Sequence, residues 1–176
     1  MIHRVVTGAA GPLGSAVSRR LRRTEGRLLR TDVEDADAGE EAFRARLEHF
    51  LATATRAELY HAAGFTAADR RVVPVTHAAA HAFAETARTL GVPACLTFFT
   101  SAGGDAAHDR AMAAVEALAR RFATEYAPAH ITTRVAALGP LTAPMDDIAR
   151  AVVALAGPEF DLATGATLPL SAHPHA

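Results

Sequence analysis

Short apolar runs alternate along the chain with longer segments in which apolar residues recur every three or four positions. The short runs predict strands, and the longer segments predict helices with one buried face. Continuous alternation of this kind is typical of a parallel sheet covered by helices on both faces. We therefore predict one α/β domain over residues 1–172, a doubly wound sheet of about six strands in three layers, with a polar tail at 173–176. The second strand should lie beside the first, and the later strands should follow outward on the other side of the first. The predicted strands are Ile2–Thr7, Arg27–Thr31, Glu58–Ala62, Ala94–Thr100, Ile131–Leu138 and Ala166–Leu170, and the predicted helices are Pro12–Arg23, Glu34–Ala54, Val72–Leu90, Arg110–Tyr126 and Asp146–Ala156.

Composition supports a globular core and argues against several classes of partner. Half of the 176 residues are hydrophobic, while the formal net charge is −1 and the sequence pI about 6.8. This balance does not favour binding to nucleic acid or to an anionic membrane surface. Cys95 is the one cysteine and lies in an apolar run, so we expect a buried, reduced thiol. No apolar run is long enough to cross a bilayer, and we expect a cytoplasmic protein.

A glycine-rich turn follows the first predicted strand and opens the first predicted helix. Its sequence, Thr7-Gly8-Ala9-Ala10-Gly11-Pro12-Leu13-Gly14, holds three glycines. Glycine accepts the dihedral angles of a tight turn, and its missing side chain lets a pyrophosphate approach the helix N–H groups. The pattern predicts nucleotide binding by Thr7, Gly8, Gly11, Pro12, Leu13 and Gly14. The alternative is a close-packed turn without a ligand.

The first acidic residue after the second strand is Asp32, which lies 18 positions beyond Gly14. A carboxylate at this place normally accepts the ribose hydroxyls of NAD, so NAD(H) is the favoured cofactor. Arg30 keeps the 2′-phosphorylated cofactor NADP(H) open. Asp32 could instead cap the helix that follows it.

Together these motifs resemble the short-chain dehydrogenase/reductases over nearly the whole chain. His61-Ala62-Ala63-Gly64 resembles the family's Asn-Asn-Ala-Gly, and Phe99-Thr100-Ser101 resembles the strand end that carries its catalytic serine. Ile131 to Leu141 is similar to the family's Ile-Arg-Val-Asn-x-x-x-Pro-Gly-Pro-Val. The resemblance implies a Rossmann-like fold, and it adds Ala63, Gly64 and Gly139 to the expected cofactor site.

The chain departs from this family at the catalytic positions. The family's proton donor is a Tyr followed four residues later by a Lys, but His108 and Met112 stand there by count. The family's structural Asn falls at Thr76, so only Ser101 remains of the usual four residues. One strand is missing between Asp32 and the strand at Glu58, so Asp32-Val33 could equally match the family's Asp-Val that contacts adenine. Little chain is left for a lid over the substrate.

A serine and a histidine are the candidate catalytic groups. In the family's geometry Ser101 and His108 would face the same cleft, and a histidine can act as acid or base near neutral pH. His61 is a second candidate, and the alternative for His108 is a solvated place at the start of a helix. His77 and His81 have a spacing that can hold a metal, but no third ligand joins them, and we expect no metal site.

We therefore expect an atypical oxidoreductase of this kind, acting on a small carbonyl or alcohol with a non-standard proton donor. Two alternatives stay open: a non-redox enzyme such as an isomerase, dehydratase, lyase or cyclase, and a catalytically silent protein that binds nucleotide or an active partner. The loss of Tyr and Lys also leaves open whether the cofactor is kept. The resemblance further implies a homo-oligomer, dimer or tetramer, formed through the helices Val72–Leu90 and Arg110–Tyr126.

Overall fold

The protein is an α/β domain built on one parallel sheet, described here from a computed structural model. The structure describes residues 1–32, 40–62, 71–139, 144–155 and 164–170. The sheet has six strands in the order β2-β1-β3-β4-β5-β6, so the predicted fold class and strand order are confirmed. The strands are β1 (Ile2–Thr7), β2 (Arg27–Thr31), β3 (Arg56–His61), β4 (Ala94–Ser101), β5 (Ile131–Leu138) and β6 (Ala166–Leu170). The helices are α1 (Pro12–Leu21), α3 (Glu40–Leu51), α4 (Val72–Leu90), α5 (Ala106–Tyr126) and α6 (Met145–Leu155), with a 3₁₀ turn at Ala127–Ala129.

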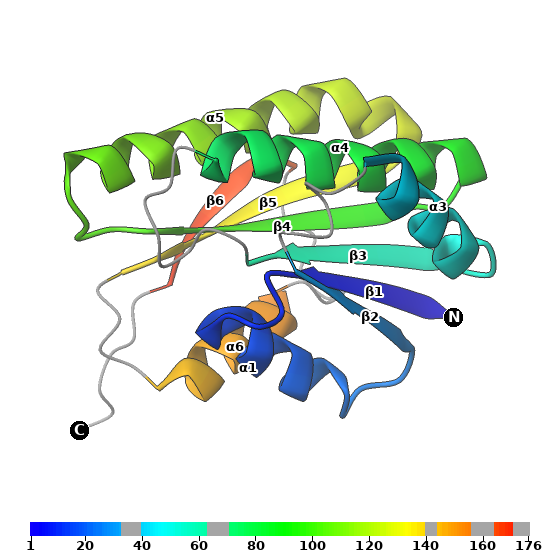
Figure 1. Cartoon of the computed structure of the whole chain (residues 1–176), viewed down its shortest axis with the longest axis horizontal. Coiled ribbons are helices and arrows are strands. Elements are labelled where there is room, and N and C mark those ends of the chain that lie inside the picture. The colour runs from blue at the N-terminus through cyan, green and yellow to red at the C-terminus, as the bar shows by residue number, and fades with distance from the viewer. Residues whose placement is uncertain (33–39, 63–70, 140–143, 156–163, 171–176) are drawn as a thin grey trace.

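Helices cover the sheet on both faces and form three layers (Figure 1). Helices α3, α4 and α5 lie on one face, and α1 and α6 lie on the other. Successive strand residues enter different cores: Val5 and Leu59 belong to the cluster under α3, α4 and α5, whereas Val6 and Tyr60 belong to the cluster under α1 and α6. Because both faces are buried, the strands appear in the sequence as continuous apolar runs. Cys95 is buried as a free thiol, as predicted.

All six strands run in one direction, so their carboxyl ends lie along one edge of the sheet. Thr7 at the end of β1 is paired with His61 at the end of β3, and His61 is paired with Phe98. Strand β4 continues from Phe98 to Ser101, which lies opposite Leu138 of β5. The glycine-rich turn after β1 and the loop after β4 therefore share this edge, which is where ligands bind in open sheets of this class.

A charged cluster lies buried within the sheet. The Glu58 carboxylate is 3 % exposed; it accepts a hydrogen bond from Arg4 Nε at 3.0 Å and another from the Tyr60 hydroxyl at 3.0 Å. Burial, together with the neighbouring Glu58 charge, raises the pKa of Tyr60 well above its usual value. Tyr60 is therefore held as a neutral donor, and the buried carboxylate is compensated by Arg4.

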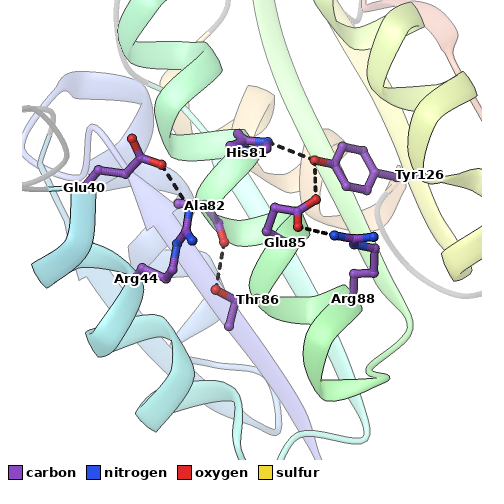
Figure 2. Close-up of polar contacts among 8 residues, drawn as sticks. All are labelled: Glu40, Arg44, His81, Ala82, Glu85, Thr86, Arg88 and Tyr126. Atoms are coloured by element: carbon purple, nitrogen blue, oxygen red, sulfur yellow. Dashed lines mark hydrogen bonds and ion pairs between the residues drawn. The ribbon is translucent and has the colours of Figure 1, made fainter.

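Helices α4 and α5 are joined by a second polar cluster, which Figure 2 shows. The buried Tyr126 hydroxyl donates to Glu85 Oε1 at 2.8 Å and lies 2.9 Å from His81 Nδ1, while Arg88 Nη2 donates to Glu85 Oε2 at 2.5 Å. Burial opposes ionisation of Glu85, but the hydrogen bonds from Arg88 and Tyr126 outweigh it and lower the pKa of that carboxyl.

Within the described ranges, no helix is both long enough and apolar enough to span a membrane.

Candidate functional site

The glycine-rich turn packs tightly against the start of α1. Gly8 has a φ of 68°, in the left-handed region that glycine enters without strain. A Cβ at Gly14 would lie 2.1 Å from the Gly8 carbonyl oxygen, so only glycine fits there without a backbone shift. At Gly11 the nearest atom to such a Cβ would be 3.4 Å away. Gly8 and Gly14 therefore shape the turn itself, whereas a Cβ at Gly11 would make only an ordinary van der Waals contact with the Gly8 carbonyl oxygen.

The N-terminus of α1 can receive an anion. Gly11 is the N-cap, Pro12 is the first helical residue, and the first helical hydrogen bond runs from Ser15 N to Gly11 O at 2.8 Å. The N–H groups of Leu13 and Gly14 precede that bond and have no acceptor within the helix. No acidic residue lies in this first turn. The predicted pyrophosphate site thus has helix N–H donors at its base, and the residues present fit the diphosphate of a nicotinamide cofactor.

The two residues expected to select the cofactor both contact the glycine-rich turn. Asp32 Oδ1 accepts a hydrogen bond from Ala10 N at 2.8 Å, and Arg30 Nη2 donates to Ala9 O at 3.2 Å. Asp32 therefore supports the turn that precedes it, rather than the next described helix, which begins at Glu40. An acidic and a basic side chain stand together at the place where the adenosine ribose is expected.

Ser101 and His108 form a hydrogen-bonded pair at the carboxyl edge of the sheet. Ser101 ends β4, His108 lies in the first turn of α5, and Ser101 Oγ is 2.9 Å from His108 Nε2. Both residues are partly exposed. The chain thus brings together the two residues that were predicted to share one site, and it joins a hydroxyl to a base.

Two neighbours hold His108 in this position. The Asp105 carboxylate caps α5 by accepting hydrogen bonds from His108 N at 2.8 Å and Ala107 N at 2.9 Å, and these bonds lower the pKa of Asp105. A Cβ at Gly104 would lie 2.4–2.6 Å from three atoms of the His108 side chain. The loop therefore needs glycine at 104 for the ring to lie beside Ser101. Neither role was predicted from the sequence, although Asp before a helix is a recognisable N-cap.

His61 lies apart from this pair, inside the domain. It is 2 % exposed; its Nδ1 is 2.7 Å from Thr7 Oγ1 and its Nε2 is 2.9 Å from Thr76 Oγ1. Thr76 donates its own hydroxyl proton to Val72 O at 2.6 Å, so it accepts from Nε2–H, and Nδ1 accepts from Thr7. Burial lowers the pKa of His61 to about 4. The ring is thus a neutral link between β1, β3 and α4, with both nitrogens engaged.

The positions that the resemblance assigns to the other catalytic residues are buried. Met112, at the place of the family's Lys, is 5 % exposed and packs in the core under α4 and α5. Thr76, at the place of the family's Asn, is 1 % exposed and contacts His61. Gly139 N donates to Leu170 O at 3.2 Å at the end of β6. Ala63 and Gly64 lie outside the described residues.

His77 and His81, whose spacing could hold a metal, are in ring contact with each other on α4. Among the described residues, no three His, Cys, Asp or Glu side chains converge on one point. The rings of His77 and His81 stack with their centroids 5.6 Å apart on α4. His77 also meets the edge of Phe122 at 5.9 Å, so these histidines link the surface of α4 to α5.

Comparison with known proteins finds solved structures of similar fold at low sequence identity. No family model matches the chain, and no curated protein matches its sequence. A 3-hydroxyacyl-CoA dehydrogenase type-2 from Mycobacterium avium has a TM-score of 0.74 at 19% identity, covering 96% of this chain and 94% of that one. A short-chain dehydrogenase/reductase from Serratia marcescens has a TM-score of 0.70 at 22% identity, covering 96% and 94%. A Brucella ovis oxidoreductase of the short-chain dehydrogenase/reductase family, in complex with a partially ordered NAD, has a TM-score of 0.73 at 16% identity, covering 96% and 99%. The chain therefore has the fold of the short-chain dehydrogenase/reductases over nearly its whole length, as the sequence motifs indicated.

Proposed function

We propose that this protein is an NAD(H)-dependent oxidoreductase that interconverts a small carbonyl compound and its alcohol, with Ser101 and His108 as its proton-transfer pair. The observation that carries the proposal is the 2.9 Å contact between Ser101 Oγ and His108 Nε2. It lies at the same sheet edge as the glycine-rich turn, so one ligand laid along that edge could contact both.

The glycine-rich turn and the residues at the end of β2 would hold the cofactor. Gly11, Leu13 and Gly14 would receive the pyrophosphate, and Asp32 would accept a ribose hydroxyl, which favours NAD(H). Arg30, bonded to Ala9 O, is the residue that could attract a 2′-phosphate instead. When bound, a nicotinamide cofactor supplies or accepts the hydride.

The serine–histidine pair would manage the proton. During reduction the Ser101 hydroxyl donates a hydrogen bond to the substrate carbonyl oxygen, and the protonated His108 donates Nε2–H to Ser101 Oγ. As negative charge develops on the carbonyl oxygen, the Ser101 proton moves to it and the His108 proton moves to Ser101. Oxidation of the alcohol runs the same transfers in reverse, with neutral His108 as the base.

This arrangement accounts for the missing tyrosine and lysine. A tyrosine has a pKa near 10 in model peptides and needs a nearby cation to give up its proton at neutral pH, whereas imidazole titrates near 6.5. A histidine donor therefore removes the need for a lysine one turn later. The apolar Met112 at that place is buried in the core, which is consistent with the loss of this requirement.

Cofactor binding is tested by thermal unfolding with NADH and with NADPH. Saturating ligand should raise the melting temperature, since a free ligand concentration of about 100 times Kd adds about 2.7 kcal/mol to the free energy of unfolding. Gly11→Asp should abolish the shift by placing bulk and negative charge beside the pyrophosphate. Ala52→Asp, an exposed change after α3, should retain it. No shift of the unsubstituted protein with either cofactor would refute the proposal.

The redox reaction is tested by following NADH consumption with a panel of small aldehydes and ketones. We expect consumption with at least one of them and formation of the matching alcohol. A protein that binds NADH but consumes it with no carbonyl compound would instead support the non-redox or the catalytically silent alternative.

We extend the proposal to assembly, with two copies associating through α4 and α5. The joined surface of these helices carries half-buried small and aromatic side chains, including Ala78, Ala114 and His77, which would allow close helix packing. The Tyr126–Glu85–Arg88 cluster would fix the angle between the two helices before they meet a second copy.

A further inference from the structure

The Ser101–His108 pair also has the composition and spacing of a serine nucleophile with its general base. We propose that Ser101 accepts acyl groups from activated carboxylic esters, with His108 as the base, so that the protein has an esterase activity that needs no cofactor. This activity goes beyond the oxidoreductase proposed above and does not depend on it.

The contact distance is the first argument. A serine hydroxyl is a weak nucleophile until a base at hydrogen-bond distance takes its proton, and Ser101 Oγ lies 2.9 Å from His108 Nε2. The Nε2 atom is the one that faces the nucleophile in serine hydrolases. Ser101 is only partly buried, at the end of β4, so an ester can reach it.

The rigidity of the pair is the second argument. His108 lies in the capped first turn of α5, where Asp105 holds both its N–H and that of Ala107. Gly104 leaves no room for a side chain beside the ring. Ser101 is fixed from the other side, because Ala102 N donates to Leu138 O at 3.2 Å and keeps the end of β4 against β5. Both partners therefore start from fixed backbone positions, as a preorganised pair requires.

We assign the oxyanion donors to the loop between the two residues. Gly103 and Gly104 are exposed, and within the described part of the chain their N–H groups take part in no loop hydrogen bond. Gly103 has a φ of 93°, a conformation that only glycine adopts readily. Backbone N–H groups of this kind stabilise the negative oxygen of a tetrahedral intermediate.

The reaction would follow an acylation step and a deacylation step. Ser101 Oγ attacks the ester carbonyl carbon, its proton passes to His108 Nε2, and the carbonyl oxygen becomes an oxyanion near Gly103 and Gly104. The intermediate then breaks its bond to the leaving alcohol, which takes the proton from His108, and an acyl-serine remains. Water, deprotonated by His108, attacks the acyl carbon, releases the carboxylic acid and returns the proton to Ser101.

The test uses two probes on the full chain without added nucleotide. p-Nitrophenyl acetate reports turnover by release of p-nitrophenolate, and diisopropyl fluorophosphate traps the nucleophile, because the serine displaces fluoride and keeps the phosphoryl group. The chain contains no lysine, so the usual competing amines are absent apart from the N-terminus. We expect one phosphoryl group per chain, located on Ser101 by peptide mapping.

Matched variants separate this role from general reactivity. Ser101→Ala should abolish labelling, and His108→Gln should slow labelling and ester hydrolysis by about 100-fold or more. Gly104→Ala, which forces the His108 ring to move, should slow them as well. Ser15→Ala on α1 and His49→Gln on the exposed face of α3 should behave like the unsubstituted protein.

The proposal is overturned by labelling on a residue other than Ser101, by no labelling at all, or by equal rates in the protein and its His108→Gln variant. Melting temperatures measured on the same samples show whether each variant is folded. A Ser101→Ala variant that loses labelling yet keeps its thermal shift with NADH would support the esterase role independently of the cofactor site.

Discussion

Acid should destabilise this protein through His61, a histidine that the fold keeps neutral. Its ring is buried between Thr7 and Thr76, with one nitrogen accepting and the other donating. Burial lowers its pKa from the ordinary 6.5 to about 4, because a charged ring would be removed from water without a carboxylate partner.

The size and sign of the effect follow from proton linkage. As the pH falls below 6.5 the unfolded chain binds a proton at His61, but the folded chain does so only near pH 4. The unfolded state therefore binds more protons in this window, and stability falls as the pH falls. The whole pKa difference corresponds to about 3 kcal/mol, of which about 2 kcal/mol is lost between pH 7 and pH 5.

The assay is urea unfolding at pH 7 and at pH 5 of the unsubstituted protein and of His61→Gln. The variant should be less stable at pH 7, since it disturbs both threonine contacts, but it should lose about 2 kcal/mol less on acidification. His49→Gln, an exposed histidine on α3, controls for ordinary titration. An equal loss in the protein and in His61→Gln would refute the reasoning and would mean that the buried ring is not kept neutral.

Three further predictions concern the glycine-rich turn, the cap of α5 and the assembly. Gly14→Ala places its Cβ 2.1 Å from a carbonyl oxygen and should lower the free energy of unfolding by about 1–3 kcal/mol. Gly11→Ala places its Cβ 3.4 Å from the nearest atom and should cost less. Urea unfolding that ranks the two variants in the opposite order would contradict the packing argument. Asp105→Ala should lower the free energy of unfolding by about 1 kcal/mol through loss of the cap, and Asp105→Asn should keep most of it; equal stabilities of the two variants would show that the cap does not matter. Light scattering at tens of micromolar should give a dimer and Ala78→Arg a monomer, so a monomeric unsubstituted protein would disprove the assembly.

The sheet and its order could be predicted because each strand is a dense apolar run between helical segments. Helix ends were harder to place, since they depend on local caps more than on periodicity. The predicted helix starting at Arg110 begins at Ala106 instead, because Asp105 caps a first turn that has no apolar stripe. The strand predicted from Glu58 begins two residues earlier, at Arg56, because a charged residue at a strand end interrupts the apolar run.

The candidate site was predictable only in part. The proximity of Ser101 and His108 followed from counting along a family pattern, and the structure places their side chains in contact. The environment of His61 could not be read in the same way, because in a sheet buried on both faces a polar residue at a strand end has no alternation that marks it as interior. The crowding of Gly104 against His108 depends on the path of a loop, which no sequence period encodes.

The central claim is that Ser101 and His108 perform the proton transfer that a tyrosine and a lysine perform in related folds. The direct measurement is kcat for NADH-dependent carbonyl reduction, at saturating NADH, in the unsubstituted protein and in Ser101→Ala, His108→Gln and the control His49→Gln. The account predicts a fall of about 100-fold or more in the first two variants, with unchanged NADH-induced thermal shifts and a normal rate in the control. Full activity in both Ser101→Ala and His108→Gln would contradict it and would place the proton donor elsewhere.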